Sequence, residues 1–142
     1  MRLLFYSSGN NPNIKRLAAA VRKVIPEHRI ESFRGLDDFR ERLRMPIEPD
    51  SIAVLSASNQ DELRQMQSIG RLLPEIYVLL VIPDRTKSTI ELAHHLLPRF
   101  ISREESDFTD LIIVLEKIYL RTQYSFQGIL FQELQDESTH LL

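Results

Sequence analysis

Five short apolar runs, each followed by a longer segment with helical spacing, constrain the fold of this chain more than any other feature. The runs span residues 2–7, 28–33, 51–56, 76–82 and 99–102. Strands that alternate with helices along one chain are typical of a parallel sheet. The third and fourth runs are almost continuously apolar, which predicts central strands covered on both faces. The second run alternates polar and apolar residues, which predicts an edge strand.

The segments between the runs have the period of amphipathic helices. Pro12 is favoured in a first helical turn, and an apolar stripe follows it: Ile14, Leu17, Ala18, Val21, Val24 and Ile25. A short helix is predicted from Leu36 to Leu43. Capping-box spacing appears at Asn59 and Glu62 and again at Ser88 and Glu91, ahead of two further helices. The fifth helix is predicted to begin near Ser106 and to bury Phe108, Leu111, Ile112, Leu115 and Ile118.

Five βα units predict a single α/β domain over residues 1–124. The expected architecture is a flavodoxin-like, CheY-like (βα)5 three-layer sandwich with a parallel sheet in the strand order 2-1-3-4-5. In that order the binding crevice lies at the carboxyl ends of strands one and three. Residues 125–142 form a predicted C-terminal extension, helical or partly disordered. Its apolar residues argue against exposure to water, so the extension is expected either to fold back on its own domain or, as the favoured alternative, to pack on a second copy: Phe126, Ile129, Leu130, Phe131 and Leu134.

Composition excludes several classes of function. The formal net charge of -2 gives no electrostatic footprint for nucleic acid. The absence of cysteine excludes a disulfide framework and a thiolate metal site. No apolar run has the length of a membrane span or of a signal peptide, so a cytoplasmic protein is expected. His94 and His95 are adjacent and diverge by about 100° on a helix, so they cannot chelate one metal ion; His94 is expected to pack and His95 to face solvent.

The turn after the first strand admits two interpretations. Its residues are Ser7, Ser8, Gly9, Asn10 and Asn11. The turn resembles the flavodoxin phosphate loop, with Ser8, Gly9 and Asn10 fitting that pattern. The resemblance implies a flavin mononucleotide or another phosphate-containing ligand held at a helix N-terminus, with Arg103 as a second anion contact. The polar loops after strands three and four, with 4 glycines and no tryptophan in the chain, argue against a flavin-ring site.

The second interpretation rests on the element order and on the stretch HHLLPRFISREESDFTDLIIVLEKI. Together they resemble the receiver domain of bacterial response regulators over residues 1–124. The stretch is similar to the end of a receiver, where a helix leads to a short strand with an aromatic residue, a basic residue and a last helix. On that match Phe100 takes the switch-aromatic position and Arg103 the position of the active-site lysine.

The receiver resemblance implies phosphoryl transfer to an aspartate, with a divalent cation held by neighbouring acids. The corresponding positions are occupied here by Ser7 and Ser8, by Leu55 or Ser56, by Ile82 or Pro83, and by Arg103. Magnesium prefers charged oxygen ligands, and the acceptor must be a carboxylate. Arginine does not replace lysine as a compact ammonium donor. The sequence therefore predicts a pseudo-receiver that is not an enzyme and has no metal or cofactor.

A receiver fold without its acids retains its surface. The resemblance implies a partner surface made by the fourth helix, the fifth strand and the fifth helix. The resulting expectation is a protein that acts by protein–protein interaction in signal transduction, within a two-component or related system. A homodimer is expected, and neither nucleic acid nor membrane is expected as a partner.

Overall fold

The computed structural model describes residues 1–9, 11–73 and 75–123. Strands and helices alternate along this part of the chain. The strands are β1 (Leu3–Ser7), β2 (Ile30–Phe33), β3 (Ile52–Ser56), β4 (Tyr77–Ile82) and β5 (Phe100–Arg103). The helices are α1 (Pro12–Val24), α2 (Leu36–Leu43), α3 (Gln60–Met66), α4 (Lys87–His94) and a last helix over 109–123, with short 3-10 helices at Glu27–Arg29 and Gln67–Leu72. The predicted extension, 125–142, lies outside the described residues.

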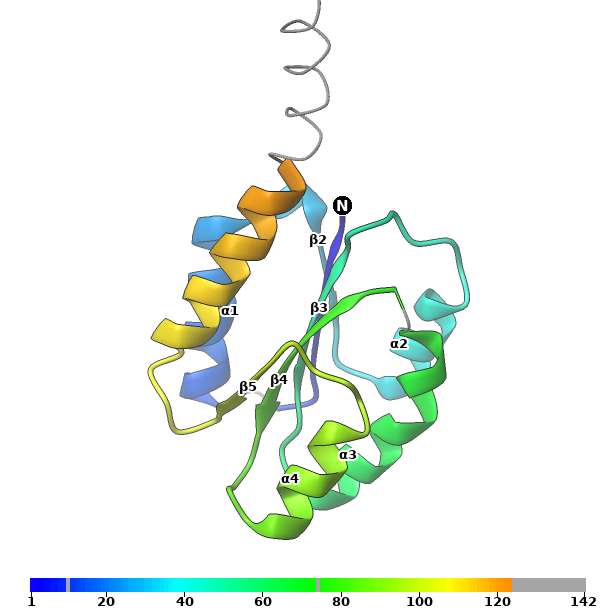
Figure 1. Cartoon of the computed structure of the whole chain (residues 1–142), viewed down its shortest axis with the longest axis vertical. Coiled ribbons are helices and arrows are strands. Elements are labelled where there is room, and N and C mark those ends of the chain that lie inside the picture. The colour runs from blue at the N-terminus through cyan, green and yellow to red at the C-terminus, as the bar shows by residue number, and fades with distance from the viewer. Residues whose placement is uncertain (10, 74, 124–142) are drawn as a thin grey trace, which may run out of the picture.

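All five strands are parallel, and their order is β2-β1-β3-β4-β5. This confirms the flavodoxin-like fold and the edge position of the alternating strand. Figure 1 shows the sheet between two layers of helices. In the described residues no helix is long and apolar enough to cross a membrane.

The strands supply two apolar clusters because successive side chains point to opposite faces of a sheet. On one face, Leu4, Tyr6, Leu55 and Leu80 pack with residues of α2, α3 and α4. On the other face, Leu3, Phe5, Ile52, Val54, Leu79 and Val81 pack with α1 and the last helix. β1, β3 and β4 are therefore buried on both sides, as their continuous apolar runs predict.

Two expectations about α4 were wrong. α4 is capped by Thr86, not Ser88, since the Thr86 hydroxyl accepts a hydrogen bond from the Thr89 amide at 3.3 Å. The turn before it is fixed by Asp84, which accepts hydrogen bonds from the amide and hydroxyl of Thr86 at 2.9 and 2.7 Å. His94 is exposed, because α4 ends there and the chain turns away.

The last helix begins three residues later than predicted. Buried Phe108 has a φ of 62° and lies before the helix rather than in it. The hydroxyl of Ser106 accepts from the Phe108 amide at 3.1 Å, and the carboxylate of Asp107 accepts from the Thr109 amide at 3.0 Å. These two side chains shape the turn that inserts Phe108 into the core, so their preference for a helix start does not extend the helix back to them.

Candidate functional site

The carboxyl ends of the strands bring together the positions where the receiver resemblance expects acids. Ser7 is in register with Ser56, Ser56 with Val81, and Val81 with Ser102. This row across the sheet carries three hydroxyls and one isopropyl group, and no carboxylate. Ser7 and Ser56 are buried, at 5% and 2% exposure.

The remaining acceptor-site positions lie on either side of this row. Leu55 is fully buried in the cluster under α2 and α3, so Ser56, rather than Leu55, has the row position beside Ser7. Ile82 is buried in the same cluster, and Pro83 is half-buried beyond it. Neither of them supplies a hydroxyl at the end of β4.

The loop after β1 is closed by hydrogen bonds of its own. The Ser7 hydroxyl donates to the Gly9 carbonyl at 3.3 Å. Asn11 caps α1, because its Oδ1 accepts from the Ile14 amide at 2.9 Å. The Nδ2 of Asn11 donates to the Glu104 carboxylate, which arrives from the residue after β5. Both polar ends of the Asn11 side chain are therefore engaged. Asn10 lies outside the described residues.

A second carboxylate, that of Glu62, lies over the same loop from the first turn of α3. It accepts from the Ser8 hydroxyl and, at 3.4 Å, from the Ser58 amide. Asn59 caps this helix by accepting from the Glu62 amide at 2.8 Å. The Asn59 cap was predicted from sequence. The long-range partner of Glu62 was not, because Ser8 lies 54 residues away.

Glu62 and Glu104 act here as hydrogen-bond acceptors that tie loops together. Each is bonded to the loop after β1, one through Ser8 and the other through Asn11. Within the described ranges, no group of three or more His, Cys, Asp or Glu side chains is placed to hold a metal ion.

Tyr6 lies beneath this loop and is 3% exposed. Its ring stacks on Phe39 with centroids 5.5 Å apart. Burial raises the pKa of the Tyr6 phenol, the negative charge of Glu62 raises it further, and a hydrogen bond with Ser8 opposes both. The phenol is therefore protonated at neutral pH and cannot serve as a general base.

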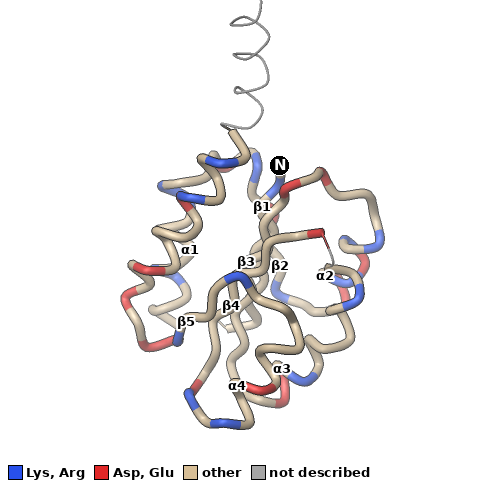
Figure 2. Tube along the Cα trace, viewed as in Figure 1, with Lys and Arg blue, Asp and Glu red and all other residues tan. Residues whose placement is uncertain are grey.

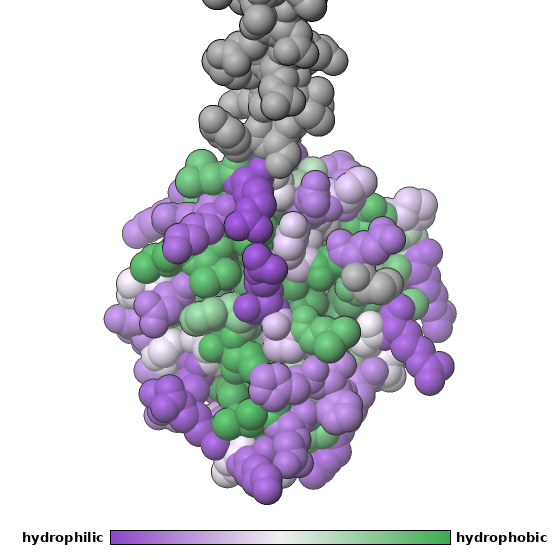
Figure 3. Space-filling model, in the orientation of Figure 1, coloured by the Kyte–Doolittle hydropathy of each residue, from purple (hydrophilic) through white to green (hydrophobic). Residues whose placement is uncertain are grey.

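Arg103 and Phe100 lie beside a groove along the outer edge of β5. The groove has a volume of about 440 Å³. Its apolar lining consists of Ile82, Ile90, Phe100 and Ile101, and polar residues at its rim include Arg85, Arg103, Asp107 and Asp110. Figure 3 shows apolar side chains gathered on the viewed face around β5, between the last helix and α4. The structure thus brings the predicted switch aromatic and Arg103 to one edge groove.

The last helix adds an exposed apolar ridge. Ile113 is 43% exposed and Leu120 is 65% exposed. Seven residues span about two helical turns, so these side chains share one side of the helix. That side faces away from Leu111, Leu115 and Ile118, which are buried against the sheet. Asp110, at the groove rim, lies one turn before Ile113.

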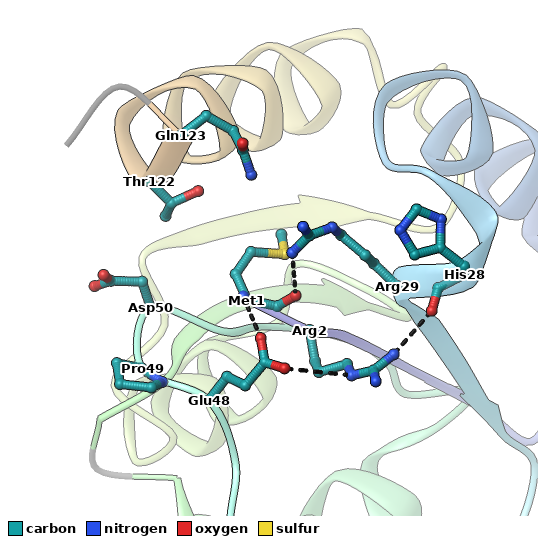
Figure 4. A pocket seen from close by; sticks show the side chains of 9 residues that line it. All are labelled: Met1, Arg2, His28, Arg29, Glu48, Pro49, Asp50, Thr122 and Gln123. Atoms are coloured by element: carbon teal, nitrogen blue, oxygen red, sulfur yellow. Dashed lines mark hydrogen bonds and ion pairs between the residues drawn. The ribbon is translucent and has the colours of Figure 1, made fainter. Parts of the chain in front are cut away.

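A polar pocket of about 510 Å³ lies at the opposite end of the sheet, near the amino ends of the strands. Figure 4 shows the amino group of Met1 and the side chain of Arg2 both joined to Glu48. The amino group of Met1 binds Glu48, and the Nε of Arg2 lies 3.8 Å from the same carboxylate. Arg29 donates to the Met1 carbonyl at 3.1 Å. The hydrogen bond and charge of the amino group, with Arg2 and Arg29, lower the pKa of Glu48. No sequence motif joins the segments that form this pocket, so the pocket could not be predicted from the sequence.

Comparison with known proteins is informative about the fold. No family model matches the sequence, and no curated protein matches it. Among solved structures, the chain is similar to a crystal structure titled "Putative pilus assembly-related protein" from Burkholderia pseudomallei K96243. The TM-score is 0.60 at 21% sequence identity, over 83% of this chain and 88% of the other. A likeness at this identity supports the five-stranded parallel α/β fold.

Proposed function

We propose that this chain is a non-catalytic receiver-like module that acts by binding another protein. The observation that carries the proposal is the row of Ser7, Ser56, Val81 and Ser102, which lacks the carboxylates that phosphoryl transfer and magnesium binding require. Two acids that reach the first loop, Glu62 and Glu104, are hydrogen-bonded to it. A regulatory role, in signalling or in an assembly process such as the one named for the Burkholderia protein, is part of the proposal.

The contact surface in this proposal is the β5 groove together with the ridge of Ile113 and Leu120. Apolar groups at the centre and charges at the rim are the usual arrangement of a protein interface. β5 is an edge strand of the sheet that the structure describes, since β4 is its one partner there. A second copy of the chain is the proposed partner at the ridge, where two such helices can bury the exposed side chains against each other.

Phosphorylation tests the non-catalytic part. After incubation of the full chain with acetyl phosphate and magnesium chloride, intact-mass measurement should show no phosphoryl adduct. A hydroxylamine-sensitive adduct would indicate an aspartyl phosphate and would refute the proposal. As a control, a receiver domain that does accept phosphate is incubated in the same tube, and its phosphorylation shows that the reagent is active.

Sedimentation equilibrium tests the second copy. The full chain should sediment as a dimer, and Ile113→Lys/Leu120→Lys should shift it to a monomer by placing cations on the ridge. Ala19→Lys/Gln65→Lys makes the same change of net charge at exposed positions of α1 and α3 and should leave the dimer intact. A monomeric wild-type chain would remove the second copy as partner.

The flavin-loop alternative is less well supported, because two side-chain donors of the loop are already bonded to carboxylates. The Asn11 amide donates to Glu104, and the Ser8 hydroxyl donates to Glu62. A phosphate at this position would have to displace negative charge. Protein purified with a flavin absorbance band would restore the alternative.

A further inference from the structure

A cleft between α1 and the edge strand β2 is lined by cations and, among the residues that the structure describes, by no acidic side chain. Its volume is about 280 Å³. Lys15 and Arg22 reach it from α1, and Arg34 from the end of β2. The floor is apolar, with Phe5, Ile14 and Phe33 among its residues. This cleft is on the opposite edge of the sheet from the β5 groove.

The charge of α1 differs from that of the helix on the other side of β2. α1 contains Lys15, Arg16, Arg22 and Lys23 and no Asp or Glu. α2 mixes both signs (Figure 2), and its arginines are paired: Arg40 with Asp37 at 2.8 Å, and Arg42 with Glu31 at 2.9 Å. Within the described part of the chain, Lys15, Arg22 and Arg34 have neither an ion pair nor a side-chain hydrogen bond. The excess of positive charge is local, since the whole chain has a net charge of -2.

The free edge of β2 provides a second kind of contact. Among the strands of the described residues, β2 pairs with β1 on one side and with none on the other. An edge strand presents unpaired N–H and C=O groups to which an extended peptide can add. Ser32, which is exposed, also lines the cleft.

The spacing of the cations matches an extended ligand. Lys15 and Arg22 are seven residues apart, which is about 10.5 Å along a helix. Alternate side chains of a β-strand are about 6.7 Å apart, so two or three acidic side chains on one side of a strand span this distance. A single compact anion supplies only one charged centre for two cations that are two turns apart.

We propose that this cleft binds an acidic, extended segment of another protein, which adds beside β2 as a further strand. Its acidic side chains pair with Lys15, Arg22 and Arg34, and its main chain bonds to the free edge. This interaction is separate from the proposed contact at β5 and the last helix. A result that refutes one of the two contacts therefore does not refute the other.

Fluorescence anisotropy with a labelled peptide tests the proposal on the full chain. The probe is an acetylated octapeptide of alternating glutamate and valine. Lys15→Glu/Arg22→Glu should weaken its binding by about tenfold or more, because both charge pairs become repulsive. Lys87→Glu/Lys117→Glu makes the same change of net charge at exposed positions outside the cleft, and it should change the affinity less than about twofold. Circular dichroism verifies that each variant is folded.

A second probe tests strand addition. The same peptide with N-methyl groups on alternate amides retains its charges but cannot donate along one edge, and it should bind about tenfold more weakly. Equal affinity of the two peptides would refute strand addition, and so would full displacement by inorganic phosphate.

The remaining control is a variant of the same chain in which three acidic residues are changed to glutamine: Glu133, Asp136 and Glu137. If the wild-type chain binds the probe, the partner proposal is supported. If binding appears only after all three are changed to glutamine, the occupant is the chain's own segment and the proposal of a second protein is wrong.

Discussion

The loops at the carboxyl ends of β1 and β3 and the groove beside β5 belong to the same rim of one sheet, yet they are built in opposite ways. In the loops, polar side chains are bonded to one another, as Asn11 is to Glu104 and Ser8 to Glu62. In the groove, apolar side chains such as Ile90 and Ile101 remain partly exposed. Hydrogen-bonded polar groups gain little from a new partner, whereas exposed apolar groups gain by burial. The loops therefore stabilise the fold, whereas the groove remains available for contact.

The largest expected change in the free energy of unfolding comes from placing a carboxylate in the row of hydroxyls. Ser56→Asp puts a charge at a position that is 2% exposed, and it should lower the free energy of unfolding by about 3 kcal/mol because burial removes the charged carboxylate from water. Urea unfolding measures the change. The matched control, Ser56→Asn, has the same size without the charge and should cost less.

Two further measurements on Ser56→Asp test this expectation. Burial raises the pKa of a carboxyl group, so the cost of Ser56→Asp should shrink toward that of Ser56→Asn as the pH falls. Magnesium should not restore stability. A gain of stability with magnesium would show that the rim can hold a cation after all.

A smaller loss of unfolding free energy is expected when the hydrogen bond between Asn11 and Glu104 is disrupted. Asn11→Asp preserves a cap for α1 but sets a second carboxylate against Glu104, so it should cost about 1 kcal/mol. Asn11→Asp/Glu104→Gln should recover most of this loss in thermal or urea unfolding. If the double variant is no more stable than the single one, the loop is not closed by this contact.

Ionisation of the Tyr6 phenol should have a weaker, pH-dependent effect on the free energy of unfolding. Its pKa is raised in the folded state, so its contribution to stability is complete below the unfolded value of about 10 and is lost as the pH rises through the folded value. Unfolding free energies of the wild type should therefore fall more steeply above pH 10 than those of Tyr6→Phe. Parallel curves for the two proteins would contradict the raised pKa.

The smallest effect on stability is expected on the exposed ridge. At protein concentrations that favour the monomer, Ile113→Ser/Leu120→Ser should change the free energy of unfolding by less than about 0.5 kcal/mol, because both side chains face solvent. Leu115→Ser, on the buried side of the same helix, should be far more destabilising. A large loss in the first variant would mean that the ridge packs within its own chain.

The fold could be predicted because its signals are local. Apolar runs and helical stripes lie within short segments, and the strand order of five βα units is limited by few packing solutions. The misplaced helix starts at Ser88 and Ser106 share one cause. Hydroxyl and carboxylate side chains favour helix starts and tight turns alike, and the choice between them depends on what the following residues bury.

The candidate site was predicted only in part. The serines at positions 7, 8 and 56 are visible in the sequence, and so is the lack of acids among them. The placement of Glu62 and Glu104 over the first loop is not visible, because their partners are 54 and 93 residues away. The cationic cleft at β2 was also missed, since scattered lysines and arginines form a patch only when α1 covers the edge strand.

By itself the sequence determined the order of strands and helices and the absence of acids at the ends of β1 and β3, because both are properties of short contiguous segments. The tertiary structure alone decided which side chains close the loops, which apolar groups remain exposed at β5 and the last helix, and where cations gather beside β2. The physical reason is that these depend on distances between residues far apart in the chain, and the chain fixes such distances only when its helices pack onto the sheet.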